Sequence, residues 1–71
     1  MKNKISEHYE SLTRKQKKIA NYILDNMNDV IFDNVTFIAE QTGTSVASVV
    51  RFTNALGYQG FPQLKDDLIN Y

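Results

Sequence analysis

The sequence contains no cysteine and only one histidine, His8. Disulfide bonds and thiolate metal sites are therefore excluded, and a single histidine cannot by itself build a histidine metal site. No apolar run approaches the roughly 20 residues that a membrane span needs, so no membrane partner is expected. The N-terminal lysines are not followed by the apolar core of a signal peptide. These absences favour a cytoplasmic protein without a metal or cofactor.

Neither sign of charge predominates, because eight basic residues balance eight acidic ones. The charges are nevertheless segregated along the chain. Residues 1–20 carry a net charge of +4, whereas residues 21–71 carry a net charge of −4. Zero overall charge argues weakly against nucleic-acid binding. The basic segment leaves two interpretations open, a solvated helix face or a face that contacts phosphates.

Strand-like alternation is nearly absent, and the apolar residues follow helical spacing instead. The length of 71 residues and the hydrophobic fraction of 42% suit one small globular domain, residues 1–71. Ile5, Tyr9 and Leu12 form one apolar stripe, and a longer stripe runs from Leu12 to Met27. The pattern predicts an all-α fold, a compact bundle of four to five short helices.

Polar residues and glycines mark the expected helix ends. Thr13 and Gln16 form a capping-box pattern at the start of the second helix, which should end near residues 26–28. Asn34 and Ser45 are N-cap candidates for the next two helices. Gly43 suits the left-handed position between these two helices.

Two further segments have less regular patterns. The segment DVIFD, residues 29–33, is expected to form a short helix or turn, with one of its three apolar residues packed inward: Val30, Ile31 or Phe32. Gly57 should end the helix that follows Gly43, and Pro62 suits the first turn of a last helix.

Two helices joined by a tight turn that contains glycine form a helix-turn-helix unit, and residues 35–54 match its spacing. Ala39 stands where the two helices cross and only a small side chain fits, and Gly43 makes the turn. Ile38, Val49 and Phe52 are the residues expected to pack on the rest of the domain. The sequence therefore predicts a homeodomain-like helix-turn-helix whose recognition helix is residues 45–56.

The first turn of this recognition helix is rich in small side chains. In a helix-turn-helix, this turn enters the major groove of double-stranded DNA, where small residues let base edges come close. Hydroxyls can bond to bases or phosphates, and apolar groups can contact a thymine methyl. Arg51 suits a guanine or a phosphate, and Asn54 suits an adenine or the backbone. The predicted DNA-binding residues are Thr44, Ser45, Val46, Ala47, Ser48, Arg51, Asn54, Tyr58, Gln59 and Lys65.

Structural roles remain open for some of these residues. Ser45 is expected to cap its helix whatever else it contacts. Arg51 could instead form an ion pair with Asp66 or Asp67 on the last helix. The residues expected to flank the recognition helix, as candidates for phosphate contacts, are Tyr58, Gln59 and Lys65.

Two other classes of function can be compared with DNA binding. The alternative is a helical protein-protein interaction module, which would use Phe37, Val46 and the basic helix as its docking surface. An enzyme is not expected, because the sequence offers no nucleophile with a base, no convergent carboxylates and no metal site. No catalytic residue is therefore predicted.

Two stretches, LTRKQKKIANYILDN and VTFIAEQTGTSVASVVRFTNALGYQGFPQLK, resemble the N-terminal DNA-binding domain of the RpiR-type bacterial transcriptional regulators. The resemblance covers residues 12–68, and its most specific part lies between Ser45 and Lys65. The chain departs from the family pattern at Arg14, Gln16, Val46 and Asn54. The resemblance implies sequence-specific DNA binding as part of a regulator of sugar or amino-sugar metabolism.

The same resemblance implies partners beyond DNA. Members of this family usually carry a C-terminal sugar isomerase (SIS) domain, which binds a phosphosugar effector and helps to form a homodimer. These 71 residues leave no room for that domain. The effector is therefore expected to act only through a part of the regulator that is absent from this chain.

Overall fold

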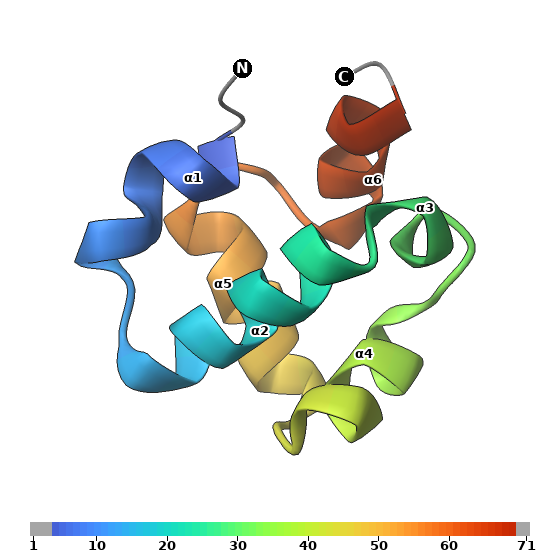
Figure 1. The fold of residues 1–71 in the computed structure, drawn as a ribbon, viewed down its shortest axis with the longest axis horizontal. Coiled ribbons are helices and arrows are strands. Elements are labelled where there is room, and N and C mark those ends of the chain that lie inside the picture. The colour runs from blue at the N-terminus through green and yellow to red at the C-terminus, as the bar shows by residue number, and fades with distance from the viewer. Residues whose placement is uncertain (1–3, 70–71) are drawn as a thin grey trace.

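Residues 4–69, which the computed structural model describes, form six α-helices and one 3₁₀ helix and contain no strand (Figure 1). The predicted all-α fold is confirmed, and two of these helices are only four and five residues long. In chain order the elements are α1 (Lys4–His8), η1 (Tyr9–Ser11), α2 (Arg14–Asp25), α3 (Met27–Val30), α4 (Val35–Thr42), α5 (Val46–Ala55) and α6 (Phe61–Ile69).

The start of α2 is fixed by the predicted capping box. The Gln16 N–H donates to Thr13 Oγ1 over 3.2 Å, and the Thr13 N–H donates to Gln16 Oε1 over 2.9 Å. Both bonds satisfy N–H groups that lack a partner within the helix. The helix ends at Asp25, with Asn26 as its C-cap, so its predicted end is also confirmed.

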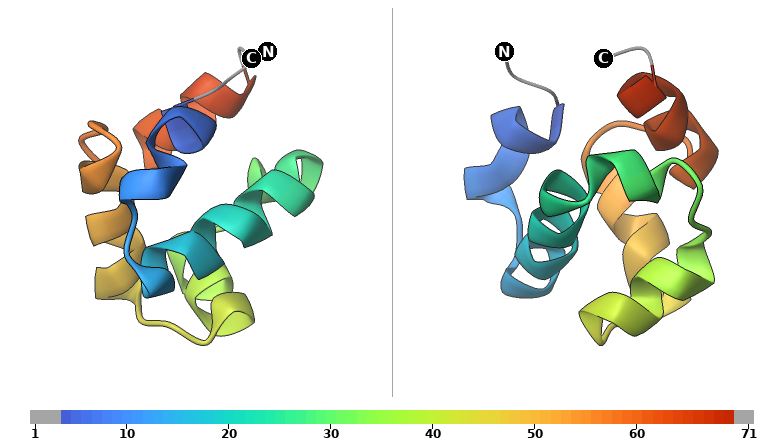
Figure 2. Two further views of the ribbon diagram at one scale, coloured as in Figure 1. Left: turned by 60° about the vertical axis from the view of Figure 1, so that its left-hand side comes forward. Right: turned by 45° about the vertical axis from the view of Figure 1, so that its right-hand side comes forward.

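The core lies where α2, α4 and α5 pack against one another, and α1 and α6 close it from the other side (Figures 1 and 2). Burial of one large apolar side chain stabilises a fold by about 1.5–3 kcal/mol, so these residues supply most of the driving force for folding. The largest apolar side chains that are almost completely buried are Ile5, Ile19, Ile23, Val30, Ile38, Val49, Phe52 and Leu64.

The segment between α3 and α4 turns only one of its three apolar residues fully inward. Val30 is completely buried, Ile31 is half-buried and Phe32 is 85% exposed. Asn34 then caps α4, since its Oδ1 accepts a 2.8 Å hydrogen bond from the Phe37 N–H, as predicted.

The arrangement of the helices separates two ends of the molecule. The turn between α4 and α5 lies at the bottom of Figures 1 and 2, whereas α1 and the end of α6 lie at the top. No helix within residues 4–69 has both the length and the apolar character needed to cross a lipid bilayer.

Candidate nucleic-acid interface

The turn between α4 and α5 has the geometry predicted for a helix-turn-helix. Gly43 has a φ of +67°, the left-handed conformation that favours glycine. The Thr44 N–H donates to the Ala39 carbonyl over 2.9 Å, which closes the end of α4. Ser45 then caps α5, because its Oγ accepts a 3.1 Å hydrogen bond from the Ser48 N–H. The predicted turn and both caps are confirmed.

Residues of the unit that were expected to face the domain do so. Ile38, Val49 and Phe52 are completely buried, and Ala39 is only 4% exposed where α4 meets α5. These contacts attach both helices of the unit to α2. The position of α5 is therefore set by the core rather than by its own surface residues.

The opposite face of α5 is open to solvent. Val46 is 42% exposed, and Ala47, Arg51 and Asn54 are exposed as well. Val50 lies half-buried on the same face, although it is not among the predicted DNA-binding residues. Its spacing of four residues from Val46 and three from Ala47 is the signal that could have identified it.

Ser48 does not belong to this open face, and its predicted placement there is corrected. Its side chain is only 9% exposed, and its Oγ lies 3.0 Å from the Ser45 Oγ. Ser48 lines a cavity together with residues at the start of α2, including Lys15.

Arg51 is exposed and forms no ion pair within residues 4–69. The alternative in which it bridges to Asp66 or Asp67 is therefore not realised. Asp67 instead accepts a 2.5 Å hydrogen bond from the Tyr58 hydroxyl. The guanidinium group of Arg51 is thus available to an external anion.

Asn54 is exposed but has a structural function as well. With its amide oriented to satisfy its hydrogen bonds, the side-chain nitrogen donates to the carbonyls of Tyr58 (3.0 Å) and Gln59 (3.3 Å). These contacts fix the loop that follows α5. Gln59 itself is exposed in that loop.

Tyr58, one of the predicted phosphate contacts, is occupied within the domain. Its hydroxyl donates to Asp67, and the Lys4 Nζ lies 4.7 Å from the centre of its ring. Partial burial and the hydrogen bond to Asp67 raise the pKa of the Tyr58 hydroxyl well above its usual range. The neighbouring carboxylate makes this position unfavourable for a phosphate.

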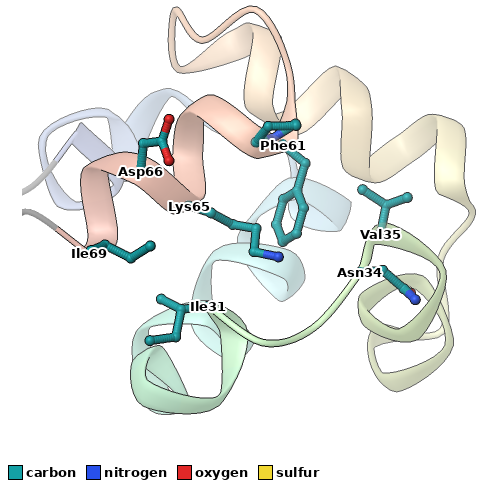
Figure 3. Close-up of a pocket in the computed structure, with 8 residues that line it drawn as sticks. Ile31, Asn34, Val35, Phe61, Lys65, Asp66 and Ile69 are labelled. Carbon is teal, nitrogen blue, oxygen red and sulfur yellow. The ribbon is translucent and has the colours of Figure 1, made fainter.

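Lys65 lies away from α5, so its predicted position beside the recognition helix is also corrected. Its Nζ donates to the Asp33 carbonyl over 2.8 Å and lies 5.4 Å from the centre of the Phe61 ring. Figure 3 shows Lys65 between α6 and the segment that connects α3 to α4. The cavity there, of about 600 Å³, is lined mainly by apolar residues, and none of its lining residues belongs to α5.

The helix-turn-helix geometry of α4 and α5 agrees with the family to which the sequence is similar. The family model described as "helix-turn-helix domain, rpiR family" matches residues 1–71, the whole chain. The chain belongs to the RpiR family. This result agrees with the resemblance found in residues 12–68. The RpiR domain is a helix-turn-helix domain of transcriptional regulators and not an enzyme.

Several bacterial proteins are similar to this RpiR domain. YfhH of Escherichia coli K12, an HTH-type transcriptional regulator, is 37% identical over 62 residues, which cover 87% of the chain and 22% of YfhH. A regulator of Haemophilus influenzae is 38% identical over 66 residues, covering 93% of the chain and 23% of that protein. The chain thus spans about a fifth of the length of these relatives.

A solved structure is similar to the RpiR domain as well. It is the crystal structure of the N-terminal domain of ybbH from Bacillus subtilis, a protein assigned as a transcriptional regulator. The two structures agree with a TM-score of 0.88 at 30% sequence identity, over 93% of this chain and 80% of the other.

The separation of charge along the RpiR sequence is also a separation in space. Arg14 and Lys15 begin α2, and Lys15 lines the same cavity as residues of α5, whereas Asp25 ends α2 and Asp29 lies in α3. This order opposes the helix dipole, which favours acidic residues at the start of a helix and basic residues at its end. The basic residues therefore do not stabilise α2 through its dipole, but they place positive charge next to α5.

Proposed function

We propose that this domain binds double-stranded DNA sequence-specifically, with the first turns of α5 in the major groove. The observation that carries the proposal is the exposed face of α5 in a helix-turn-helix of a transcriptional-regulator family. That face combines small or apolar side chains with an arginine that has no ion-pair partner within residues 4–69. Such a surface suits an approach to base edges, because little side-chain volume separates the helix backbone from the groove.

The exposed residues suit complementary parts of a DNA site. Val46, Ala47 and Val50 can contact thymine methyl groups, which are the apolar feature of the major groove. Thr44 and Ser45 stand at the start of α5, where hydroxyl and backbone N–H groups suit a phosphate. Among the predicted DNA-binding residues, Tyr58 and Lys65 are left out of the proposed interface because their polar groups bind Asp67 and Asp33.

We further propose how a regulator that contains this domain would bind DNA and respond to an effector. A single helix-turn-helix covers little DNA, whereas two copies related by a dyad read half-sites about 34 Å apart. We infer that operator binding requires a homodimer in the cytoplasm. A sugar isomerase domain elsewhere in the regulator would sense a phosphosugar, and the genes controlled would concern sugar or amino-sugar metabolism. The family resemblance supports this extension.

An amide NMR titration of the 71-residue chain with a mixed-sequence duplex tests DNA binding. We expect the signals of residues 44–54 to move at low salt and to return toward their free positions at physiological salt, because phosphate contacts release counterions. Signals of Phe37 and Phe32, which are also exposed, should stay in place. If the signals of residues 44–54 do not respond to DNA, and the signal of Phe37 responds to a protein partner, the domain is better explained as a protein-protein interaction module.

A further inference from the structure

A cavity lined by polar and charged residues lies beside the recognition helix, where the start of α2 meets α5. The cavity has a volume of about 230 Å³, and we call it the α2–α5 cavity. Its lining residues come from both helices and from the cap of α2: Thr13, Lys15, Gln16, Ser48 and Arg51. None of these five residues is acidic.

Two cationic side chains share this cavity. Lys15 and Arg51 are both exposed, and neither forms an ion pair with any residue in the described range 4–69. Two like charges that line one small space repel each other, and an anion between them removes that repulsion. The arginine also offers a planar set of donors that matches the oxygens of a phosphate.

The neutral residues of the cavity add hydrogen-bond donors. The Thr13 hydroxyl accepts from the Gln16 N–H, so its own proton is available to a ligand. Gln16 uses its side-chain oxygen for the Thr13 N–H, which leaves its NH₂ group as a donor. Ser48 Oγ lies 3.0 Å from Ser45 Oγ, and when Ser45 donates across this contact the Ser48 hydroxyl proton is left for a ligand. The cavity therefore suits an anion with several acceptor oxygens.

We propose that the α2–α5 cavity binds one phosphate group of the DNA backbone, with Lys15 and Arg51 as its cationic ligands. This inference rests on the proposed function, because it is the first turns of α5 in the groove that bring a DNA strand past the cavity. In this arrangement Arg51 contacts a phosphate of the DNA backbone rather than a guanine base. Base readout is then left to Val46, Ala47 and Val50, and Lys15 joins the interface from a helix outside the helix-turn-helix.

The test compares the salt dependence of binding for three proteins: the wild-type chain, Lys15→Gln and Lys18→Gln. Lys18 is an exposed lysine of α2 that does not line the cavity, so its variant removes the same charge without the contact. Affinity for a fluorescent mixed-sequence duplex is measured by anisotropy at several salt concentrations. Circular dichroism melts verify that both variants remain folded.

We expect Lys15→Gln to reduce the slope of log K against log salt by about 0.9, the value for one phosphate contact. Between 50 and 200 mM salt this changes the ratio of wild-type to variant affinity by about 3-fold. Lys18→Gln should give a line parallel to the wild type. Equal slopes for the two variants would overturn the cavity assignment and leave the proposed function standing.

Two further outcomes separate the possible failures. If the wild-type chain binds no duplex even at low salt, the proposed function fails and the cavity assignment fails with it. A titration with inorganic phosphate provides the other arm. If phosphate alone shifts the amide signals of Lys15 and Ser48 while the salt slopes of both variants match the wild type, the cavity is a free-anion site and not a DNA contact.

Discussion

Ala47→Glu is the substitution that most directly tests whether the first turn of α5 enters the groove. Ala47 is exposed in that turn, and the first turn of α5 contains no acidic residue. A glutamate near the start of a helix interacts favourably with the helix dipole, by about 0.3–1 kcal/mol. The variant should therefore be as stable as the wild type, or more stable by up to about 1 kcal/mol.

The same substitution should weaken DNA binding strongly. A carboxylate about 4 Å from a phosphate is repelled by about 1 kcal/mol in bulk water and by about 4 kcal/mol at the effective dielectric constant of a protein surface. Affinity should accordingly fall by a factor between about 5 and about 700, since each 1.4 kcal/mol is tenfold. Fluorescence anisotropy with a labelled duplex measures this loss, and urea unfolding measures the stability.

Two control variants separate the local effect of the added charge from the effects of side-chain size and of long-range repulsion. Ala47→Gln has a side chain of similar size without the charge, so it isolates the steric part of the effect. Ala55→Glu adds the same charge at the exposed far end of α5, where long-range repulsion is similar but no groove contact is proposed. If Ala47→Glu binds DNA as tightly as the wild type, the first turn of α5 does not lie in the groove and the proposed docking is wrong.

Three further predictions concern single residues. Arg51→Ala should weaken the binding of all duplexes equally, by about 1–3 kcal/mol of binding free energy. It should also reduce the slope of log K against log salt by about 1 and leave the melting temperature of the domain unchanged. A loss confined to one DNA sequence would show that Arg51 reads a base. Gly43→Ala should destabilise the fold by about 1–2 kcal/mol in urea unfolding, because a residue with a Cβ is strained at a φ of +67°. An added Cβ would meet no atom within 4 Å, so no steric clash contributes to this cost. A loss well above this would mean that a steric clash, and not the backbone conformation, sets the cost. The raised pKa of Tyr58 means that the folded state holds this proton more tightly than the unfolded state. Stability from this group is complete below about pH 10 and is lost as the pH rises further, so Tyr58→Phe should flatten the alkaline part of a stability-pH curve. An unchanged alkaline slope would contradict this.

Local chemistry made much of this fold predictable. The caps at Thr13, Asn34 and Ser45 and the left-handed Gly43 depend on residues within four positions of one another, and all are found as predicted. The buried stripe of α5 also followed from helical spacing, because apolar residues three and four apart share a face.

The contacts between distant segments were harder to predict. Ser48 precedes the buried Phe52 by one helical turn, which indicates its inward side, but only the packing of α2 on α5 decides that Lys15 is its neighbour. Likewise, the spacing of α6 does not show that Lys65 reaches the Asp33 carbonyl, 32 residues earlier in the chain. Residue types alone made Lys65 and Tyr58 look like phosphate contacts, whereas their partners within the domain were set by the tertiary structure.

The opposite placement of the α4–α5 turn and of the outer ends of α1 and α6 has a practical consequence. A surface linker, a fluorophore or a fused protein attached before α1 or after α6 would leave from the top of the molecule in Figure 1, far from the turn at the bottom. The domain can thus be immobilised or recombined with another polypeptide without covering α5. Chimaeras that exchange only this domain should transfer DNA-sequence preference from one regulator to another.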